Sequence, residues 1–167
     1  MHKLKGILLL IAIITLNSCN SNTSKTDSDW VYLFNGKDLN GWITKINHHE
    51  VGDNYANTFR VIDGAIQVNY NEYSEFGERF GHLYYKKPFS SYHLKFEYRF
   101  TDQWMEDAPR GTYRNSGVMI HSQNPNSILK DQNWPISVEY QILAERAENE
   151  SRPTGNMCSP GTEVFFK

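Results

Sequence analysis

The sequence predicts an all-β fold, either a sandwich or a barrel of short strands. Short runs in which every second residue is apolar recur along the chain, and Gly, Pro, Asn and Asp separate them. Aromatic residues make up 14% of the chain, a composition that favours strands and also suits the stacking of sugar rings. No stretch of the sequence combines a sustained helical period with end caps.

The first 29 residues are expected to lie outside this fold. Residues 1–19 begin with a short basic segment, continue with an apolar run too short to span a bilayer, and end at Cys19. This order resembles a bacterial lipoprotein signal peptide, in which cleavage before Cys19 frees that cysteine for lipid attachment. Residues 20–29 are polar and predict a flexible tether. We therefore expect an exported lipoprotein anchored to a membrane of the bacterial cell envelope, in the periplasm or at the outer membrane; an ordinary secretory signal is the alternative.

One domain without internal repeats is predicted over residues 30–167. Its expected strands are Val31–Phe34, Gly41–Lys45, Phe59–Ile62, Ala65–Val68, Gly81–Tyr85, Tyr92–Phe100, Ser116–His121, Ile136–Leu143 and Glu163–Phe166. No turn or polar tail follows the last of these strands, so we expect a domain truncated at its C-terminus. A disulfide partner of Cys158 would then lie in the missing part; the alternative is a free, buried thiol.

Two of these expectations rest on strong local signals. Asp63 and Gly64 stand between two short apolar runs and predict a tight hairpin, because both central positions of that turn type need a positive φ. Along Tyr92–Phe100, apolar and charged residues alternate at every position. This pattern predicts a strand with one buried face and one polar face.

Polar side chains occupy one face of each of two later strands. Ser137, Glu139 and Gln141 alternate with apolar residues and are expected to stand in one row. Asn115 and His121 lie at the two ends of the preceding polar strand. The two strands together predict a sheet that recognises a polar ligand, with one carboxylate at its centre.

Two long loops flank these polar strands and are predicted to form the walls of a cleft. They are residues 101–114, which end at Arg114, and residues 122–135, which contain Trp134. Long loops without secondary structure in a small domain are usually functional.

Five segments resemble motifs of the bacterial 3-keto-disaccharide hydrolase family. In order, they are Trp30–Trp42, Phe59–Ile66, Tyr92–Phe100, Arg114–Val118 and Ser137–Gln141. The resemblance implies a concanavalin A-like jelly-roll sandwich of two antiparallel sheets. It also implies an exported enzyme of carbohydrate degradation, with a domain that normally continues past Lys167.

The number of carboxylates bears on the reaction. Concanavalin A-like glucanases set two or three carboxylates along one strand, and retaining hydrolysis needs a pair about 5 Å apart. The corresponding row here holds Glu139 alone, unless Glu97 faces the same cleft. A 3-keto sugar needs a single base, because its ketone acidifies the proton on C2 and the resulting enolate can expel the substituent at C1. We therefore expect a hydrolase or lyase that acts on 3-keto-glycosides or related disaccharides.

Glu139 is the expected base, and His121 is a candidate acid or base. The expected substrate-binding residues are Arg99, Arg114, Asn115, Gln141 and Trp134. The first three would steady the enolate oxygen, and Trp134 or Tyr113 would stack on a sugar ring. Simpler interpretations remain open: Asn115 as a turn residue, His121 as a structural histidine, and Arg114 as loop surface.

The sequence indicates no partners other than a carbohydrate substrate and the membrane to which a lipid anchor would attach the protein. The net charge of −2 gives no bias towards nucleic acid. No cofactor is expected, and a divalent metal has only weak support, from His121, Glu139 and Glu97 if their strands adjoin. The alternative function is a non-catalytic, lectin-like carbohydrate-binding module on the same sandwich.

Overall fold

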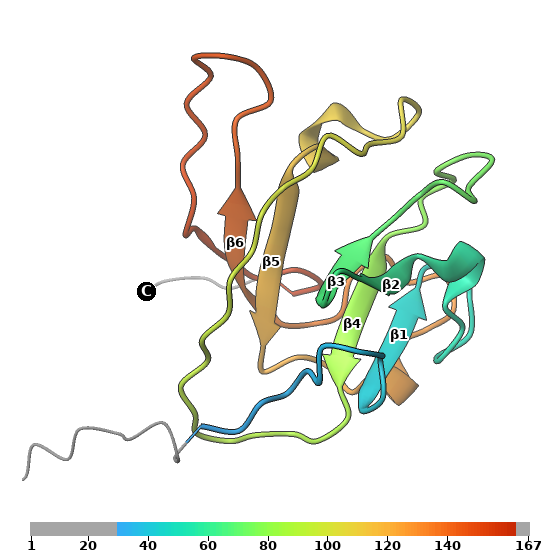
Figure 1. Ribbon diagram of the computed structural model, residues 1–167, viewed down its shortest axis with the longest axis vertical. Coiled ribbons are helices and arrows are strands. Elements are labelled where there is room, and N and C mark those ends of the chain that lie inside the picture. Colours follow the sequence, from blue (N-terminus) through green and yellow to red (C-terminus); the bar gives the residue numbers. More distant parts are fainter. Residues whose placement is uncertain (1–29, 163–167) are drawn as a thin grey trace, which may run out of the picture. The chain divides into compact units, whose positions relative to one another are not determined.

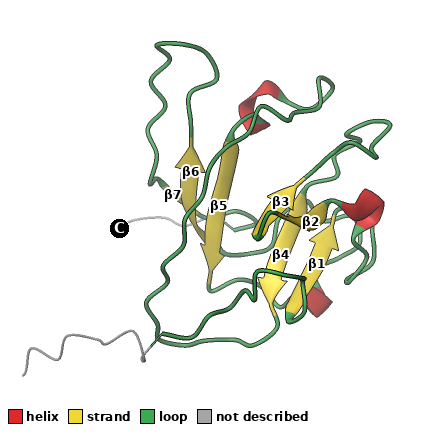
Figure 2. Cartoon of the chain, in the orientation of Figure 1, coloured by secondary structure: helices red, strands yellow, loops and turns green. Residues whose placement is uncertain are grey.

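The structure is a computed structural model that describes residues 30–162, and these residues form antiparallel strands with almost no helix (Figures 1 and 2). The strands are β1 (Trp42–Ile46), β2 (Phe59–Ile62), β3 (Ala65–Val68), β4 (Gly81–Tyr85), β5 (Asn115–Ile120), β6 (Val138–Leu143) and β7 (Met157–Cys158). Short 3₁₀ helices are η2 (Tyr55–Asn57), η3 (Arg110–Thr112) and η4 (Pro125–Ser127). The predicted all-β class is confirmed, and the antiparallel sheets agree with a concanavalin A-like sandwich.

Three antiparallel sheets organise the described residues. β1 pairs with β4, β2 pairs with β3, and β6 lies between β5 and β7. The β2–β3 hairpin turns at Asp63 and Gly64 with φ of 50° and 74°, as the turn signal predicted. The expected strand Glu163–Phe166, the truncation after it, the signal peptide and the tether lie outside the described residues.

Two expected strands do not form. Val31–Phe34 is irregular, and Tyr92–Phe100 has no strand pairing despite its alternating sequence. Alternation specifies two faces, but a strand also needs a neighbour that accepts and donates its backbone hydrogen bonds. No described strand pairs with Tyr92–Phe100, and its apolar side chains at Leu94 and Phe96 are 45% and 47% exposed. The prediction was therefore wrong about pairing and about a buried face.

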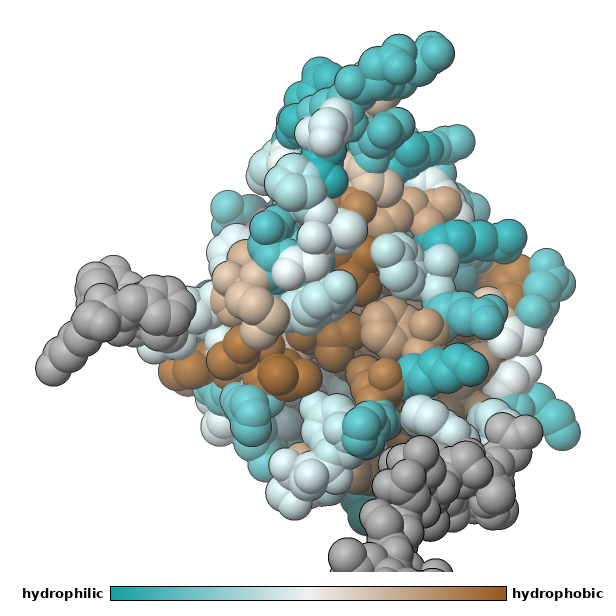
Figure 3. Space-filling model, turned by 90° about the vertical axis from the view of Figure 1, so that its left-hand side faces the viewer, coloured by the Kyte–Doolittle hydropathy of each residue, from teal (hydrophilic) through white to brown (hydrophobic). Residues whose placement is uncertain are grey.

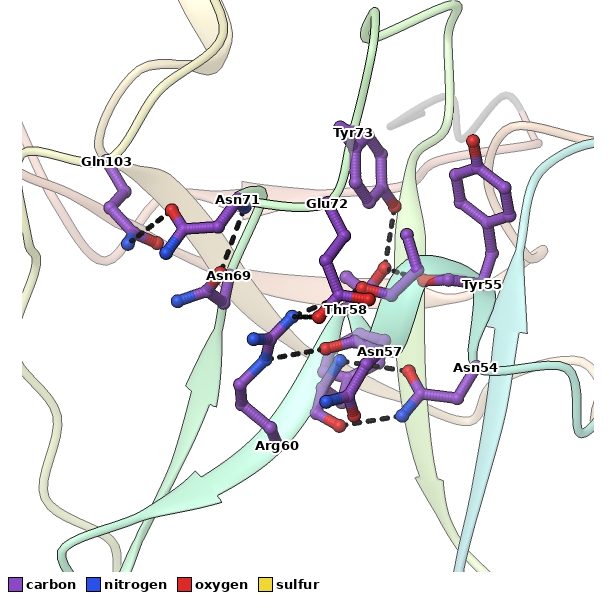
Figure 4. A network of polar contacts seen from close by, with 12 residues as sticks. Asn54, Tyr55, Asn57, Thr58, Arg60, Asn69, Asn71, Glu72, Tyr73 and Gln103 are labelled. Carbon is purple, nitrogen blue, oxygen red and sulfur yellow. Dashed lines mark hydrogen bonds and ion pairs between the residues drawn. The ribbon is translucent and has the colours of Figure 1, made fainter.

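The outer edge of β2 is satisfied by a side chain instead of a strand (Figure 4). The amide of Asn69 donates to the carbonyl of Thr58, so the backbone groups of Phe59 point away from β3. Asn54 reaches both of them: its Nδ2 donates to the Phe59 carbonyl at 2.7 Å, and its Oδ1 accepts from the Phe59 amide at 2.9 Å. Asn54 thus replaces a neighbouring strand at this position.

Further polar contacts fix the tight turn that precedes β2. Ala56 and Asn57 both have a φ of 49°, an unusual conformation for residues other than glycine. The Arg60 guanidinium donates to the carbonyls of these two residues at 3.2 and 2.8 Å, and it also pairs with Glu72. Arg60 thus binds the backbone of the turn and the side chain of Glu72 at once, which identifies this network as structural (Figure 4).

The loop of residues 122–135 is held against β1 and β4 by buried polar groups. Lys45, which is 1% exposed, donates from Nζ to the carbonyl of Lys130 at 3.0 Å. His82 lies 2.8 Å from the carbonyl of Asn133, and burial lowers the pKa of its imidazole. The loop is therefore fixed at several points, as a cleft wall needs to be.

Buried apolar side chains are few in the described part of the chain, and many large ones are exposed. Ile46, Phe59 and Ile142 are among the buried residues, whereas Tyr98, Tyr140 and other aromatic residues are about half exposed. Apolar side chains form patches between polar ones in Figure 3. A large open cavity of about 2000 Å³ lies among the strands, and residues of β3, β4, β5 and β6 line it.

Replacing Asn54 with Ala should lower the free energy of unfolding by about 2 kcal/mol, because two backbone groups of the buried residue Phe59 lose their partner. Urea unfolding followed by tryptophan fluorescence measures the change. Asn126→Ala is the matched control, since that exposed side chain makes no hydrogen bond with a described residue. Equal destabilisation by both changes would contradict this account.

Candidate functional site

The register of β5 and β6 brings Glu139, Gln141 and Asn115 to one face of their sheet. Gly117 pairs with Gln141, and Met119 pairs with Glu139, so these side-chain positions and that of Asn115 share a face. The short strand β7 extends this face, because its Cys158 pairs with Glu139 on the other side. The predicted row of polar residues is thus present from Glu139 to Gln141 and continues across to Asn115.

Glu139 lies directly over Gly117. A Cβ atom added at Gly117 would stand 2.2 Å from Oε1 of Glu139 and 2.7 Å from its Cγ. Only glycine leaves room for this carboxylate, which explains a glycine inside a strand, where glycine otherwise weakens pairing. Gly117 was not among the predicted site residues; its position inside a predicted strand was the available signal.

The carboxylate of Glu139 is half-buried and makes no hydrogen bond or ion pair with any residue between 30 and 162. Burial alone raises the pKa of Glu139 above its ordinary value of 4.5, and no neighbouring charge contributes to the shift. A desolvated carboxylate without a partner is unusual in a folded protein, and it is a better base than an exposed one.

The amides of Gln141 and Asn115 form a short chain beside Glu139. Gln141 Nε2 donates to Asn115 Oδ1 at 3.4 Å, and Asn115 Nδ2 donates to the carbonyl of Gly111 at 3.1 Å. Asn156 donates to Oε1 of Gln141 at 3.4 Å. Each NH₂ group has two hydrogens, so both amides keep a donor for a ligand. Asn115 begins β5 and is part of the strand, not of a separate turn.

Ser137 does not extend the row. It is 3% exposed, and its hydroxyl donates to the carbonyl of Pro135 at 3.2 Å. β6 begins one residue later, at Val138. The polar row therefore starts at Glu139, and the expected contribution of Ser137 to it was wrong.

Arg114 is held mainly by other protein groups. Its Nη2 binds Asp102, its Nη1 donates to the carbonyl of Glu145 at 3.0 Å, and its guanidinium lies 5.2 Å from the centre of the Tyr113 ring. The contact with Asp102 raises the pKa of Arg114 further above its ordinary range. Its Nε–H is buried without a hydrogen-bond partner among the described residues.

The remaining predicted residues lie around the cavity, and within the described part of the chain none of them forms a hydrogen bond or ion pair with Glu139. His121 follows β5 with a φ of 50° and is exposed, and Arg99 is exposed on the unpaired segment. Neither makes a hydrogen bond or ion pair with another described residue. Trp134 is 43% exposed, and its ring lies 4.7 Å from that of Phe80. All predicted site residues line the large cavity, but it is wider than a typical ligand pocket, so lining it does not bring them into mutual contact.

Two other carboxylates, Asp63 and Glu97, line the same cavity. No group of three or more His, Cys, Asp or Glu side chains that could hold a metal ion occurs within residues 30–162. No helix in that part of the chain is long and apolar enough to cross a membrane.

Comparison with known proteins identifies the family. No curated protein and no solved structure matches the chain. The family of 3-keto-alpha-glucoside-1,2-lyase-like domains matches residues 29–165. This membership supports a glycoside-cleaving function and a carbohydrate substrate, in agreement with the polar face on β5 and β6. The chain belongs to the 3-keto-alpha-glucoside-1,2-lyase-like domain family.

Proposed function

We propose that the domain cleaves 3-keto-glycosides by eliminating the substituent at C1, with Glu139 as the base. The observation that carries the proposal is the state of this carboxylate: it is half-buried, unpaired, and raised in pKa by burial alone. A general base works best when its pKa approaches the operating pH, and desolvation moves Glu139 in that direction.

The electrostatic surroundings of Glu139 favour elimination over ordinary glycoside hydrolysis. Hydrolysis by two carboxylates sets the second one about 5–9 Å from the first. On the described face that β5, β6 and β7 share, Glu139 is the only carboxylate. Asp63 and Glu97 line the cavity from other segments of the chain. One isolated base fits a substrate whose own ketone supplies the activation.

The proposed reaction runs in two stages. Glu139 takes the proton from C2, and the electrons of the C2–H bond form an enolate with the ketone at C3. The enolate then expels the C1 substituent, which leaves with its oxygen and takes up a proton, and a C1–C2 double bond conjugated with the ketone remains. Addition of water to C1 afterwards gives the free 3-keto sugar, so the net result of both stages is hydrolysis.

The other predicted residues have defined tasks in this scheme. The free N–H groups of Asn115 and Gln141 are donors for the enolate oxygen, and the unpaired guanidinium of Arg99 adds positive charge to the cavity. His121 is the candidate proton donor to the leaving group, and Trp134 offers an exposed ring for stacking on sugar.

The proposal is tested with an oxidised disaccharide and its unoxidised parent in D₂O. We expect cleavage of the 3-keto-glycoside, with an ultraviolet-absorbing enone as an intermediate or product, and no cleavage of the parent. Cleavage of the parent at a similar rate would refute the elimination, and binding of both sugars without cleavage would favour the lectin-like alternative. In the same experiment Glu139→Gln should lower turnover about 10²- to 10⁴-fold, because the amide cannot accept the C2 proton.

The pH dependence follows from the raised pKa. Turnover should rise with pH through the pKa of Glu139, above 4.5, as the base ionises. Folding favours the neutral acid, so ionisation removes stability as the pH rises through that pKa. Glu139→Gln should therefore be at least as stable as the wild type at pH 7, and this difference should vanish below pH 4.5. A large loss of stability at pH 7 would indicate a structural role for the carboxylate.

Gly117→Ala should reduce turnover about tenfold to a hundredfold, because the new Cβ displaces the Glu139 carboxylate. Steady-state kinetics measure the loss, and circular dichroism checks the fold. Gly111→Ala is the matched control, since a Cβ there would meet no atom within 4 Å. Unchanged turnover in Gly117→Ala would show that the position of Glu139 over β5 is irrelevant to the reaction.

The proposed setting of this activity is the bacterial cell envelope. The segment ending at Cys19 supports export and lipid attachment, with residues 20–29 as the tether. Cys19→Ala should move the protein from the membrane fraction to the soluble fraction when cells are fractionated. If the variant stays in the membrane fraction, Cys19 is not the site of the membrane anchor.

A further inference from the structure

A second, smaller pocket lies at the end of β5 and β6 that is remote from Glu139. Its volume is about 190 Å³, and it is lined by Trp104, Arg110, Tyr113 and Arg146. Trp104, Arg110 and Tyr113 belong to the loop before β5, and Arg146 follows β6. The pairing of Asn115 with Leu143 places both of these loops at the same end of the sheet (Figure 1).

The pocket is built to a fixed shape. The rings of Trp104 and Tyr113 are 5.6 Å apart and tilted by 52°, and the indole N–H of Trp104 donates to the Thr112 hydroxyl at 3.4 Å. Arg152 ties the two loops together, because its Nη1 donates to the carbonyls of Tyr113 and Ala144 at 2.8 and 3.0 Å. Two aromatic rings in contact at an angle form one wall of a slot, and this wall suits a flat or ring-shaped group.

The charge at this slot is positive and centred on Arg110. Arg146 is neutralised by Glu150, which accepts from its Nε at 2.8 Å and from its Nη2. This contact lowers the pKa of Glu150, so that pair stays ionised on both sides. Arg110 is exposed, and its guanidinium makes no hydrogen bond or ion pair with a residue in the described part of the chain. A guanidinium without a partner beside two aromatic rings favours a carboxylate carried on a ring.

The slot is separate from the part of the sheet that the Glu139 carboxylate covers. The Glu139 carboxylate lies over Gly117, two residues along β5 from Asn115, or about 7 Å at the rise of a strand. The slot lies beyond Asn115, whose side chain donates to the carbonyl of Gly111 in η3. Trp104 lines both the slot and the large cavity, so the two spaces adjoin. An elongated ligand can therefore reach from one to the other.

We propose that this slot binds a ring-borne carboxylate at the far end of an elongated glycoside. Arg110 pairs with the carboxylate, and Trp104 or Tyr113 stacks on the ring from one side. The part of the inference that concerns the substrate rests on the proposed function, but binding of the carboxylate itself does not. The ring is either a uronic acid or an aromatic acid, since both present the same group to Arg110.

Equilibrium binding tests the slot without any turnover. Methyl glucuronoside and benzoate are titrated into the protein while tryptophan fluorescence is recorded, with Trp104→Phe to identify the responding indole. Methyl glucoside and benzamide are the neutral counterparts. We expect one or both carboxylates to bind, with Arg110→Gln weakening that binding at least about tenfold. The stronger of the two carboxylates identifies the ring class.

Lys37→Gln is the matched control for loss of one positive charge, because this exposed lysine lines neither space. It should leave carboxylate binding unchanged. The proposal is overturned if the neutral rings bind as tightly as the carboxylates, if inorganic sulfate does so, or if Arg110→Gln and Lys37→Gln have equal effects. Because no sugar is cleaved in this experiment, its failure is separate from a failure of the elimination at Glu139.

Discussion

The pairing of β5 with β6 is the constraint on which the candidate site depends. Side chains alternate between the faces of a sheet, so a slip of one residue would turn Glu139 and Gln141 to the opposite face. Contacts at both ends of the ladder prevent that slip. At one end, the backbone N–H of Gln123 donates to the carbonyl of Ile136 at 2.7 Å. At the other end, the backbone N–H of Ala144 donates to the carbonyl of Arg114 at 3.1 Å. The flanking loops thus fix the register as well as forming the surroundings of the face.

Within that register, Gly117 and Glu139 are each unfavourable for stability, and each explains why the other is present. Glycine weakens a strand because it packs no side chain, and a carboxylate loses hydration when it is half-buried. Together they allow the carboxylate to lie flat on the neighbouring strand, where the backbone of β5 shields it from water. The desolvation that raises its pKa is therefore a direct consequence of a missing Cβ on the next strand.

The sequence predicted the elements whose signals are local and could not predict those that depend on distant partners. The Asp63–Gly64 hairpin and the strands on either side of it form as expected, because the turn chemistry is contained in a few residues. Tyr92–Phe100 has an equally clear alternation but does not pair, since pairing requires a neighbour that no local pattern supplies.

The same division applies to the candidate site. Alternation on β5 and β6 predicted that Glu139, Gln141 and Asn115 share a face, and the register places them there. It could not reveal that Arg114 is held by Asp102 or that Gly117 lies under Glu139. Those contacts depend on how a loop folds back and on which residue lies opposite in the ladder, and neither is encoded in spacing along one strand.

The arginines are grouped at one end of the strands, and this explains why their positive charges do not lower the pKa of Glu139. Arg110, Arg114, Arg146 and Arg152 all lie near the Asn115 end of the strands, and no cation contributes to the pKa of Glu139. A guanidinium about 4 Å from this carboxylate would stabilise its ionised form by about 4 kcal/mol in partly screened surroundings, enough to lower the pKa by about three units. At about 10 Å in water, the rise of the three residues from Gly117 to Arg114, the same charge is worth about 0.4 kcal/mol, which leaves the basicity of Glu139 intact. Separation along the strand therefore allows one end of the sheet to attract negative charge while the other end keeps a carboxylate that can take a proton.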